Sequence, residues 1–408
     1  MDRGSFFGVM PPPVSAIILK PGTVQPVWAG HPWVFPQAVE RIEGGAVAGA
    51  EIDVLDGRGN YLGRALYSPS SAIVARIYSR TSTRLDRQWF AEQLARALER
   101  RKELGLPNER TNAFRAVHAE GDDLPGLVVD LFDRTAVVQL GTIGLKQREG
   151  LLLELIEEVF GATTIIDRSS PAAARAEGFE PGVGIVRGSS ELSELRFREL
   201  GIDYRVPLEL GQKTGFYLDQ RPLRARVRRL AERRRVLDTF CYVGSLAMAA
   251  AAGGAASVRA VDTSALALEV AASSVAANGL QGRVELVRED AREALTRAGR
   301  QGGYDLVICD PPKLAPTRAS SRRALATMRQ LAALGCRATR AGGLLALSSC
   351  SAAIGLNELT RSLAVGGRDV HVRPVVIERI FQGADHPVPA AFPEGLYLST
   401  VIARIHPL

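Results

Sequence analysis

Cysteine, histidine and aromatic residues are scarce in this chain of 408 residues, which has four cysteines, five histidines and 6% aromatic residues. The cysteines show no C-x-x-C spacing and no neighbouring pair of histidines, which argues against a zinc site and a disulfide framework. No apolar run is long enough to predict a membrane-spanning helix. Residues 1–15 lack the charged and then apolar pattern of a secretory signal, so we expect them to form an extension of a cytoplasmic protein that contacts no membrane.

Acidic residues are fewer than basic ones, with 44 Asp and Glu against 51 Lys and Arg and a formal net charge of +7. Such an excess favours a polyanionic partner, because the neutralisation of phosphates releases counterions. The excess is concentrated in residues 221–235, RPLRARVRRLAERRR, which hold eight arginines and one glutamate. Two interpretations are open: a nucleic-acid contact that uses Arg221 and Arg224, or the solvated face of a helix.

Three segments of the chain differ in pattern, in agreement with the two or three domains that its length suggests. Residues 16–84 contain short strand-like runs separated by Gly and Asp-Gly turns, which predict a small all-β barrel. Residues 85–205 open with a helical pattern and then mix helix and strand, so we expect a central α+β domain. Residues 206–408 alternate strand and helix, which predicts an α/β fold with a doubly wound, mainly parallel sheet.

Ligands of such sheets bind at the carboxyl ends of the strands. The predicted strands end at or just before five side chains that could carry chemistry: Asp238, Asp262, Asp290, Asp310 and Cys350. We therefore expect these residues to surround one cleft. Each of the first three acids, taken alone, is also explained as a helix N-cap.

A missing motif narrows the identity of the ligand. A dinucleotide site needs G-x-G-x-x-G, and the loop LDTFCYVGSLA (237–247) has only Gly244. This loop opens into a helix, which suits a polar ligand without a pyrophosphate. Asp262 is placed to bind ribose hydroxyls, and Asp290 is placed to bind an adenine amino group. Acids on three successive strands therefore favour S-adenosylmethionine over a nicotinamide cofactor.

The sequence DPPK (310–313) follows the fourth strand of this segment. Its prolines have no backbone N–H and stiffen the chain, which leaves Asp310 directed into the cleft. D-P-P at this place resembles the substrate-base motif of class I methyltransferases that act on nucleic-acid bases or amides.

Further motifs extend the resemblance from about residue 16 over nearly the whole chain. HPWVF (31–35) resembles part of the PUA domain, a small RNA-binding barrel. The chain as a whole is similar to the bacterial large-subunit ribosomal RNA cytosine-C5 methyltransferases, which have PUA, central α+β and catalytic domains. The motifs that occur in the family's order are GQKTGFYLDQR (211–221), LDTFCYVGSLA, ICDPPKLA (308–315), LSSCS (347–351) and ADHPVPAAFPEGLYL (384–398).

The resemblance implies a Rossmann-like class I methyltransferase domain over residues 206–408, with S-adenosylmethionine as cofactor and large-subunit ribosomal RNA as partner. A homodimer is the default expectation for its assembly. RNA contacts would come from His31, Trp33 and Lys313 besides the two arginines, although His31 also suits a packing role. Ser245 departs from the family, where a second glycine is common, and fits if its backbone angles are ordinary. The cofactor cleft would be lined by Lys213, Phe216, Tyr217, Asp219, Asp238, Phe240, Gly244, Asp262, Asp290 and Asp310.

Cys350 is then the expected nucleophile. Cytosine C5 reacts poorly with a methyl donor, so a thiolate must first add at C6; after methylation a base removes the C5 proton and the thiolate leaves. Such a thiol needs a lowered pKa. Asp310 would hydrogen-bond the N3/N4 edge of the base and favour protonation at N3. The alternative for Cys350 is a small buried hydrophobic side chain, which is how we interpret the other three cysteines.

The base that removes the C5 proton has two candidates, Asp385 and His386. Histidine has a suitable pKa for proton transfer, but Asp-His-Pro also suits a turn. Three other functions are open for the whole chain. Cys350 disfavours guanine methylation, because the related guanine methyltransferases lack this cysteine. The retained acids of the site disfavour an inactive RNA-binding protein, and the missing glycines of the dinucleotide motif disfavour a nicotinamide oxidoreductase.

Overall fold

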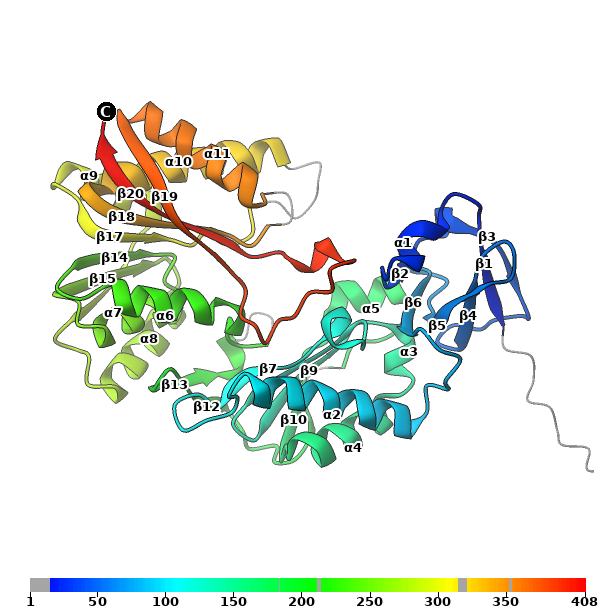
Figure 1. Ribbon diagram of the computed structural model, residues 1–408. Coiled ribbons are helices and arrows are strands. Elements are labelled where there is room, and N and C mark those ends of the chain that lie inside the picture. Colours follow the sequence, from blue (N-terminus) through cyan, green and yellow to red (C-terminus); the bar gives the residue numbers. More distant parts are fainter. Residues whose placement is uncertain (1–14, 183, 211–213, 315–320, 352–353) are drawn as a thin grey trace, which may run out of the picture.

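The computed structural model describes residues 15–182, 184–210, 214–314, 321–351 and 354–408. Figure 1 shows three bodies in chain order: a β-rich N-terminal body, a central body and a C-terminal α/β body. In the part of the chain that the structure describes, no helix is long and apolar enough to cross a membrane.

The N-terminal body is a six-stranded sheet with the order β2-β6-β5-β4-β1-β3. Alternate side chains of a strand point to the same face, so Ile52 and Val54 of β4 both lie in the buried core. The strand-like runs therefore predict this body correctly. Its strands are β1 (Ala16–Leu19), β2 (Trp33–Val34), β3 (Val39–Glu43), β4 (Glu51–Leu55), β5 (Tyr61–Tyr67) and β6 (Ala75–Ser79), with helix α1 (Val24–Trp28) after β1.

The central body is a five-stranded sheet, ordered β11-β10-β9-β8-β7, with helices α2 and α4 packed together beside it (Figure 1). Helix α2 begins after Asp86, whose carboxylate accepts a hydrogen bond from the Trp89 backbone N–H. Its apolar stripe, Phe90, Leu94 and Ala97, has helical spacing and joins the core. The elements are α2 (Arg87–Glu103), β7 (Ala113–His118), β8 (Leu127–Phe132), β9 (Thr135–Leu140), α3 (Ile143–Lys146), α4 (Glu149–Phe160), β10 (Thr164–Asp167), α5 (Pro171–Glu177), β11 (Gly184–Arg187) and the hairpin β12 (Glu194–Glu199) and β13 (Ile202–Pro207).

The C-terminal body is a seven-stranded sheet with the order β16-β15-β14-β17-β18-β20-β19. The first five strands of this order are parallel, and β20 runs antiparallel to its neighbours. The chain moves outward from β14 to β16 and then returns to β17 on the other side of β14, so the topological switch point lies between β14 and β17. The strands are β14 (Arg235–Thr239), β15 (Ser257–Asp262), β16 (Val284–Arg288), β17 (Tyr304–Cys309), β18 (Thr339–Ser349), β19 (Val372–Phe381) and β20 (Ser399–Pro407).

Helices cover both faces of this sheet, as a doubly wound fold requires. One apolar core contains side chains of α6, α7 and α8, and the other contains side chains of α9, α10 and α11. The predicted α/β architecture is thus confirmed. The helices are α6 (Arg221–Leu230), α7 (Ser245–Ala252), α8 (Ala265–Ala277), α9 (Ala291–Arg300), α10 (Ser321–Ala338) and α11 (Leu356–Asp369).

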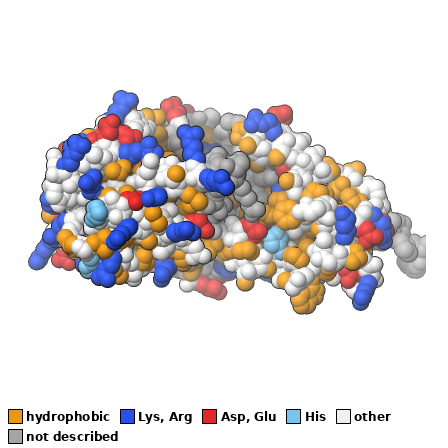
Figure 2. Space-filling view, turned by 90° about the horizontal axis from the view of Figure 1, so that it is seen from above, with side chains coloured by type: hydrophobic (Ala, Val, Ile, Leu, Met, Phe, Trp, Pro, Cys, Tyr) orange, Lys and Arg blue, Asp and Glu red, His pale blue; other side chains and the backbone are white. Residues whose placement is uncertain are grey.

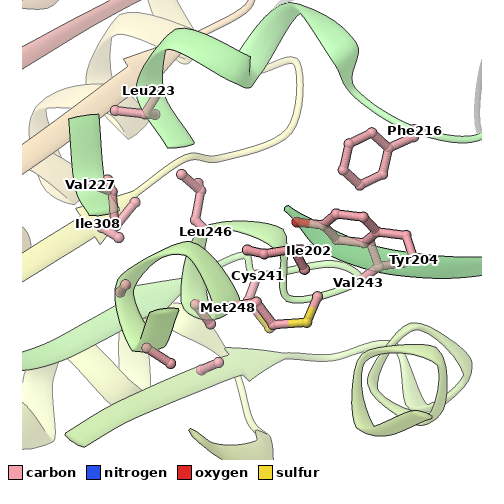
Figure 3. Close-up of a cluster of buried hydrophobic side chains, with 14 of the residues drawn as sticks. Ile202, Tyr204, Phe216, Leu223, Val227, Cys241, Val243, Leu246, Met248 and Ile308 are labelled. Atoms are coloured by element: carbon pink, nitrogen blue, oxygen red, sulfur yellow. The ribbon is translucent and has the colours of Figure 1, made fainter. Parts of the chain in front are cut away.

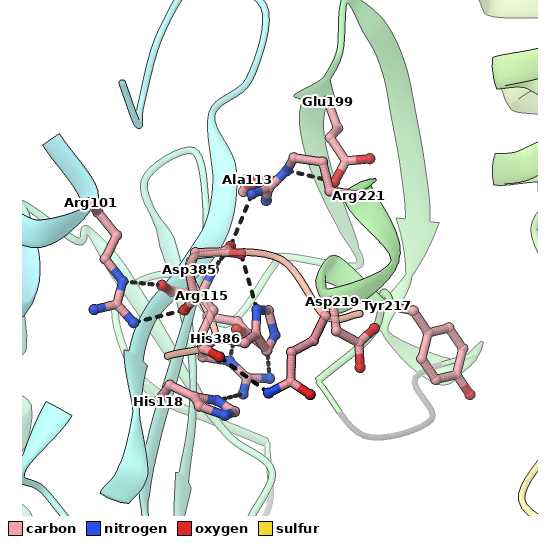
Figure 4. A network of polar contacts seen from close by, with 12 residues as sticks. Arg101, Ala113, Arg115, His118, Glu199, Tyr217, Asp219, Arg221, Asp385 and His386 are labelled. Atoms are coloured by element: carbon pink, nitrogen blue, oxygen red, sulfur yellow. Dashed lines mark hydrogen bonds and ion pairs between the residues drawn. The ribbon is translucent and has the colours of Figure 1, made fainter. Parts of the chain in front are cut away.

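The segment between β19 and β20 reaches from the C-terminal body to the central one through Asp385 (Figure 4). One Asp385 carboxylate oxygen accepts hydrogen bonds from the Arg115 backbone N–H and from Arg221 Nη1, each at 3.0 Å. Its carbonyl accepts a hydrogen bond from Arg101 Nη2 at 2.8 Å. Burial alone would raise the pKa of Asp385, but Arg221 and His386 outweigh burial and lower it.

Asp385 and His386 are 1% and 2% exposed, so neither offers a surface to a substrate. His386 Nδ1 lies 3.0 Å from the Asp385 carboxylate. The structure therefore supports the turn interpretation of Asp-His-Pro, which is the favoured one of the two, over a role of either residue as the base.

We expect Asp385→Asn to lower the free energy of unfolding by about 2 kcal/mol, because it removes one of the two carboxylates that pair with the Arg221 guanidinium and leaves only Glu199. Asp369→Asn is the matched control, since Asp369 pairs with Arg329 at the exposed end of α11. Urea unfolding followed by tryptophan fluorescence would measure both. Equal losses in the two variants would contradict the structural role of Asp385.

Candidate active site

The expected ligand cleft lies at the switch point of the sheet. Asp238 of β14 is paired in register with Ile308 of β17, and Asp310 follows two residues later. Strand β15 ends at Asp262, and β18 ends one residue before Cys350. Because these four strands are parallel, the four functional side chains lie at one edge of the sheet.

The loop after β14 has an unusual backbone. Phe240, Tyr242 and Gly244 have φ angles of 61°, 50° and 72°, and residues of ordinary φ alternate with them. Three backbone N–H groups of this loop are used within the protein: Cys241 donates to the Val261 carbonyl, Gly244 donates to the Cys241 carbonyl, and Tyr242 donates to Asp262. An added Cβ at Gly244 would lie 3.2 Å from Ala271 Cβ. Ser245 begins helix α7 without a positive φ, so its departure from the family is accommodated.

Asp262 holds this loop in place. Its two carboxylate oxygens accept hydrogen bonds from the backbone N–H groups of Tyr242 and Ser264, each at 2.9 Å, and each oxygen keeps a further lone pair for a ligand hydroxyl. Asp290 is exposed and accepts a hydrogen bond from the Arg292 backbone N–H at 2.8 Å as the N-cap of α9. Asp290 is therefore a helix N-cap, which is the alternative that the sequence allows, and its contact with the adenine amino group stays a prediction.

Asp238 is wholly buried, and neither of its carboxyl oxygens has a hydrogen-bond partner of normal geometry within the described residues. Burial, followed by the charge of Asp310, raises the pKa of Asp238 well above its ordinary value. A buried carboxyl without partners is costly, and a ligand that donates a hydrogen bond would satisfy it. The Asp238 carboxyl therefore fits the amino group of S-adenosylmethionine, and the Asp262 carboxylate fits its ribose hydroxyls.

Asp310 is held by Gln220, which lies in the short 3-10 turn η4 (Leu218–Gln220) ahead of α6. Gln220 Nε2 donates a hydrogen bond of 2.7 Å to Asp310 Oδ2. Burial and then the charge of Asp219 raise the pKa of Asp310 to about 7, while Gln220, Arg224 and Ser348 oppose the rise. Asp310 therefore exists in both protonation states near neutral pH, as a group that shares a proton with a base must.

Cys350 is the one cysteine of the four with substantial exposed surface. Burial raises the pKa of both Cys309 and Cys336 to about 12, which suits the structural role expected of them. Tyr217 lies close enough to Cys350 that burial, Tyr242 and the thiolate charge together raise the pKa of its hydroxyl. The site thus brings Tyr217, Asp310 and Cys350 into electrostatic contact.

Phe216 does not line the cleft, which corrects the expectation of a cofactor contact. Its ring is 5% exposed and packs 4.9 Å from the Tyr204 ring, between centroids, within the apolar cluster of Figure 3. The Arg224 guanidinium lies over the face of the Phe216 ring, with its central carbon 4.6 Å from the ring centroid. Cys241 belongs to the same cluster, as its structural interpretation predicts.

The two arginines expected to contact RNA are also corrected. Arg224 is 1% exposed, and its guanidinium donates to both Glu199 carboxylate oxygens and to the Tyr217 carbonyl. Arg221 pairs with the same glutamate and with Asp385. A charge is buried only when it is paired, so both arginines serve the fold.

His31 is a packing residue, as its alternative interpretation states. It is 9% exposed, and its ring centroid lies 5.6 Å from that of Phe392. Trp33 lies beside it, and its Nε1 donates to Glu120 of the central body at 2.8 Å. These contacts join the N-terminal body to the other two, and the RNA contact of Trp33 stays a prediction.

Two expected lysine contacts have different outcomes. Lys313 is exposed next to Asp310, where a nucleic acid can reach it, and its role stays a prediction. Lys213 lies outside the described residues. Figure 2 shows basic side chains scattered among acidic and apolar ones on the face it presents, so the net charge does not form a single patch on that face.

Three residues of the site were not expected from the sequence: Gln220, Ser348 and Tyr397. Gln220 and Ser348 adjoin Asp310, and the Tyr397 hydroxyl donates to Asp219 at 2.7 Å. All three lie inside motifs that carry the family resemblance. Their positions could have been noticed there, but their partners come from distant strands.

Comparison with known proteins identifies two of the three bodies. Residues 17–80 match the PUA-like domain family, and residues 186–387 match the S-adenosylmethionine-dependent methyltransferase family. Two proteins named ribosomal RNA large subunit methyltransferase I are similar over nearly the whole chain. The one from Alteromonas mediterranea is 36% identical over 95% of this chain and 98% of its own, and the one from Yersinia pseudotuberculosis is 35% identical over 95% and 99%.

Solved structures share the fold of the whole chain. A SAM-dependent methyltransferase from Streptococcus mutans aligns with a TM-score of 0.79, and the methyltransferase SMU.776 in complex with SAH aligns with 0.82. Both are 19% identical, and both alignments cover 95% of this chain and 99% of the other.

We expect Gln220→Met to raise the pKa of Asp310, because it removes the donor that stabilises the ionised carboxylate. A hydrogen bond to a charged group is worth about 1.5–3 kcal/mol, so the pKa of Asp310 should rise by about one to two pH units. Calorimetric titration with S-adenosylmethionine at several pH values would give the dissociation constant as a function of pH, and the inflection near pH 7 in this curve should move to higher pH in the variant. Gln88→Met on the exposed face of α2 is the control, and an unmoved inflection in Gln220→Met would contradict the assignment.

Proposed function

The chain belongs to the ribosomal RNA large subunit methyltransferase I family, and we propose that it methylates carbon 5 of a cytosine in large-subunit ribosomal RNA through a covalent cysteine adduct. S-adenosylmethionine is the methyl donor. The observation that carries the choice of cytosine C5 is that a partly exposed thiol, Cys350, and a carboxyl with a raised pKa, Asp310, both lie at the switch point of the sheet.

S-adenosylmethionine supplies an electrophilic methyl group when it is bound. The left-handed loop at residues 240–244 would border the cofactor, and Asp238 would accept a hydrogen bond from its amino group. Asp262 would accept hydrogen bonds from the ribose hydroxyls with the lone pairs that the loop leaves unused.

Cys350 attacks C6 of the cytosine as a thiolate and forms the Sγ–C6 bond. The electron pair of the C5–C6 double bond then moves toward N3, where Asp310 supplies a proton or shares one. A carboxyl whose pKa is about 7 can do so at neutral pH, whereas an ordinary aspartate is ionised there. C5 of this adduct then attacks the methyl group, which leaves its donor. A base takes the C5 proton, and the electrons of the C5–H bond re-form the C5–C6 double bond and expel the thiolate from C6, while N3 returns its proton to Asp310.

The geometry around Asp310 supports this role. Gln220 donates to one carboxyl oxygen, and Ser348, whose hydroxyl shares a 2.8 Å hydrogen bond with Thr400, lies near enough to Asp310 to lower its pKa. Both partners are buried, so the carboxyl is held in one orientation. A fixed orientation lowers the entropic cost of aligning the base for attack by Cys350.

We expect Cys350→Ala to lose at least about 10³-fold of turnover, because it removes the nucleophile, and to keep its affinity for S-adenosylmethionine. Ribosomal RNA from a strain that lacks the gene is the substrate, and nucleoside mass spectrometry measures 5-methylcytidine. Cys336→Ala is the matched control, since this thiol is buried in α10 and should leave turnover unchanged. A methylguanosine product that persists in Cys350→Ala would overturn the proposal.

A further inference from the structure

An open cavity of about 570 Å³ lies at the C-terminal end of α6, at the opposite end of that helix from Gln220. Three arginines line it: Arg110 from the loop before β7, and Arg228 and Arg229 from the last turn of α6. None of the residues that line it is acidic. The arginines that line this cavity have no carboxylate among the other lining residues, whereas most buried arginines elsewhere in the protein are paired with one.

Two of these guanidinium groups converge on one neutral acceptor. Arg228 Nη1 donates to the Leu200 carbonyl at 2.6 Å, and Arg110 Nη2 donates to the same oxygen at 3.4 Å. Leu200 has a φ of 53° in the turn of the β12–β13 hairpin, which presents this carbonyl to both. A single carbonyl dipole does not offset the repulsion between two cations, whereas an anion between them would.

The other arginines of α6 have acidic partners, which the arginines at the C-terminal end of this helix lack in the described part of the chain. Arg221 and Arg224 pair with Glu199, and Arg226 pairs with Glu378. Within the described residues, no ion pair includes Arg110, Arg228 or Arg229. The helix dipole favours cations in the last turn of α6, but this reason does not extend to Arg110, which comes from another body of the protein.

We propose that this cavity binds a phosphodiester of the RNA backbone, outside the catalytic cleft. Planar guanidinium groups recognise phosphate oxygens through paired N–H donors, and three of them around one open space suit that ligand. Helix α6 has ten residues and is therefore about 15 Å long, so it connects the cavity to the turn that holds Asp310. The inference rests on the proposed function only in taking RNA as the partner, and the methylated atom does not affect it.

The test compares RNA binding by the full chain with and without these side chains. Arg110 and Arg229 are exposed, so Arg110→Ala combined with Arg229→Ala should fold normally. The probe is a fluorescent large-subunit ribosomal RNA fragment, titrated at several salt concentrations. Loss of one phosphate contact should reduce the slope of log K against log salt by about 0.7–0.9 and weaken binding at low salt by about tenfold. Affinity for S-adenosylmethionine should not change.

Arg233→Ala is the matched control, because Arg233 belongs to the same basic run, its side chain is 91% exposed and it has an acidic neighbour, Glu232, at 4.0 Å. It should leave the salt slope unchanged. A double variant with the slope and affinity of the wild type would overturn the proposal, and so would a lower melting temperature without a change in slope. Saturation of the cavity by inorganic phosphate with no effect on RNA binding would identify an adventitious anion site and also overturn it.

Failure of this inference is separable from failure of the proposed function. Binding is measured without methyl transfer, so a methylguanosine product would overturn the cytosine assignment and leave the salt slope informative. Conversely, if the double variant keeps the salt slope of the wild type and the wild type forms 5-methylcytidine, the proposed phosphate contact is overturned and the catalytic assignment stands.

Discussion

The buried carboxylate of Glu199 is the interaction on which the active site depends. It accepts hydrogen bonds from two arginines one helical turn apart, Arg221 and Arg224, at the start of α6. Arg224 also donates to the Tyr217 carbonyl at 2.9 Å, so the same guanidinium fixes the turn that carries Gln220. Loss of one member of such a buried pair would leave the other charged and unsolvated, so these contacts stabilise the turn.

Buried carboxyl groups at the switch point give the site its chemistry. Asp238 and Asp310 both have raised pKa values, chiefly because burial disfavours the charged form and the neighbouring carboxylates repel. A cationic ligand beside these groups would favour their ionised forms. Protonation and cofactor binding are therefore thermodynamically linked at this site. Burial and the charge of Asp219 thus raise the pKa of Asp310 to about 7, where it can exchange a proton near neutral pH.

The segment between β19 and β20 fixes the three bodies relative to one another. Phe392 packs its ring against Trp33 at 4.7 Å between centroids, and Asp385 reaches the central body. An added Cβ at Gly121 of the central body would lie 2.0 Å from the Pro387 carbonyl oxygen, so the backbones touch there. The PUA-like body is thereby held in a defined position relative to the catalytic cleft.

Much of the fold and of the site could be predicted because both depend on local pattern. Alternation of strand and helix requires a parallel sheet, and parallel strands bring their carboxyl ends together, so Asp238, Asp262, Asp310 and Cys350 were expected at one edge. The errors concern residues whose partners lie far away in sequence. Arginine is a residue type usually found at the surface, so the sequence does not predict that Arg224 is buried. Its charge is neutralised by Glu199 of β12, which lies apart from it in sequence.

The sequence by itself determined the class of fold, the order of the bodies and the strand ends that carry the chemistry, because hydrophobic periodicity and turn residues act over short distances along the chain. The tertiary structure alone decided which charges are paired. Eight arginines in one run are alike in sequence, yet three are neutralised by glutamates or aspartates from distant elements and two face a cavity without an acid. Electrostatic partners are set by distances in space, and these distances follow only from the packed arrangement of all three bodies.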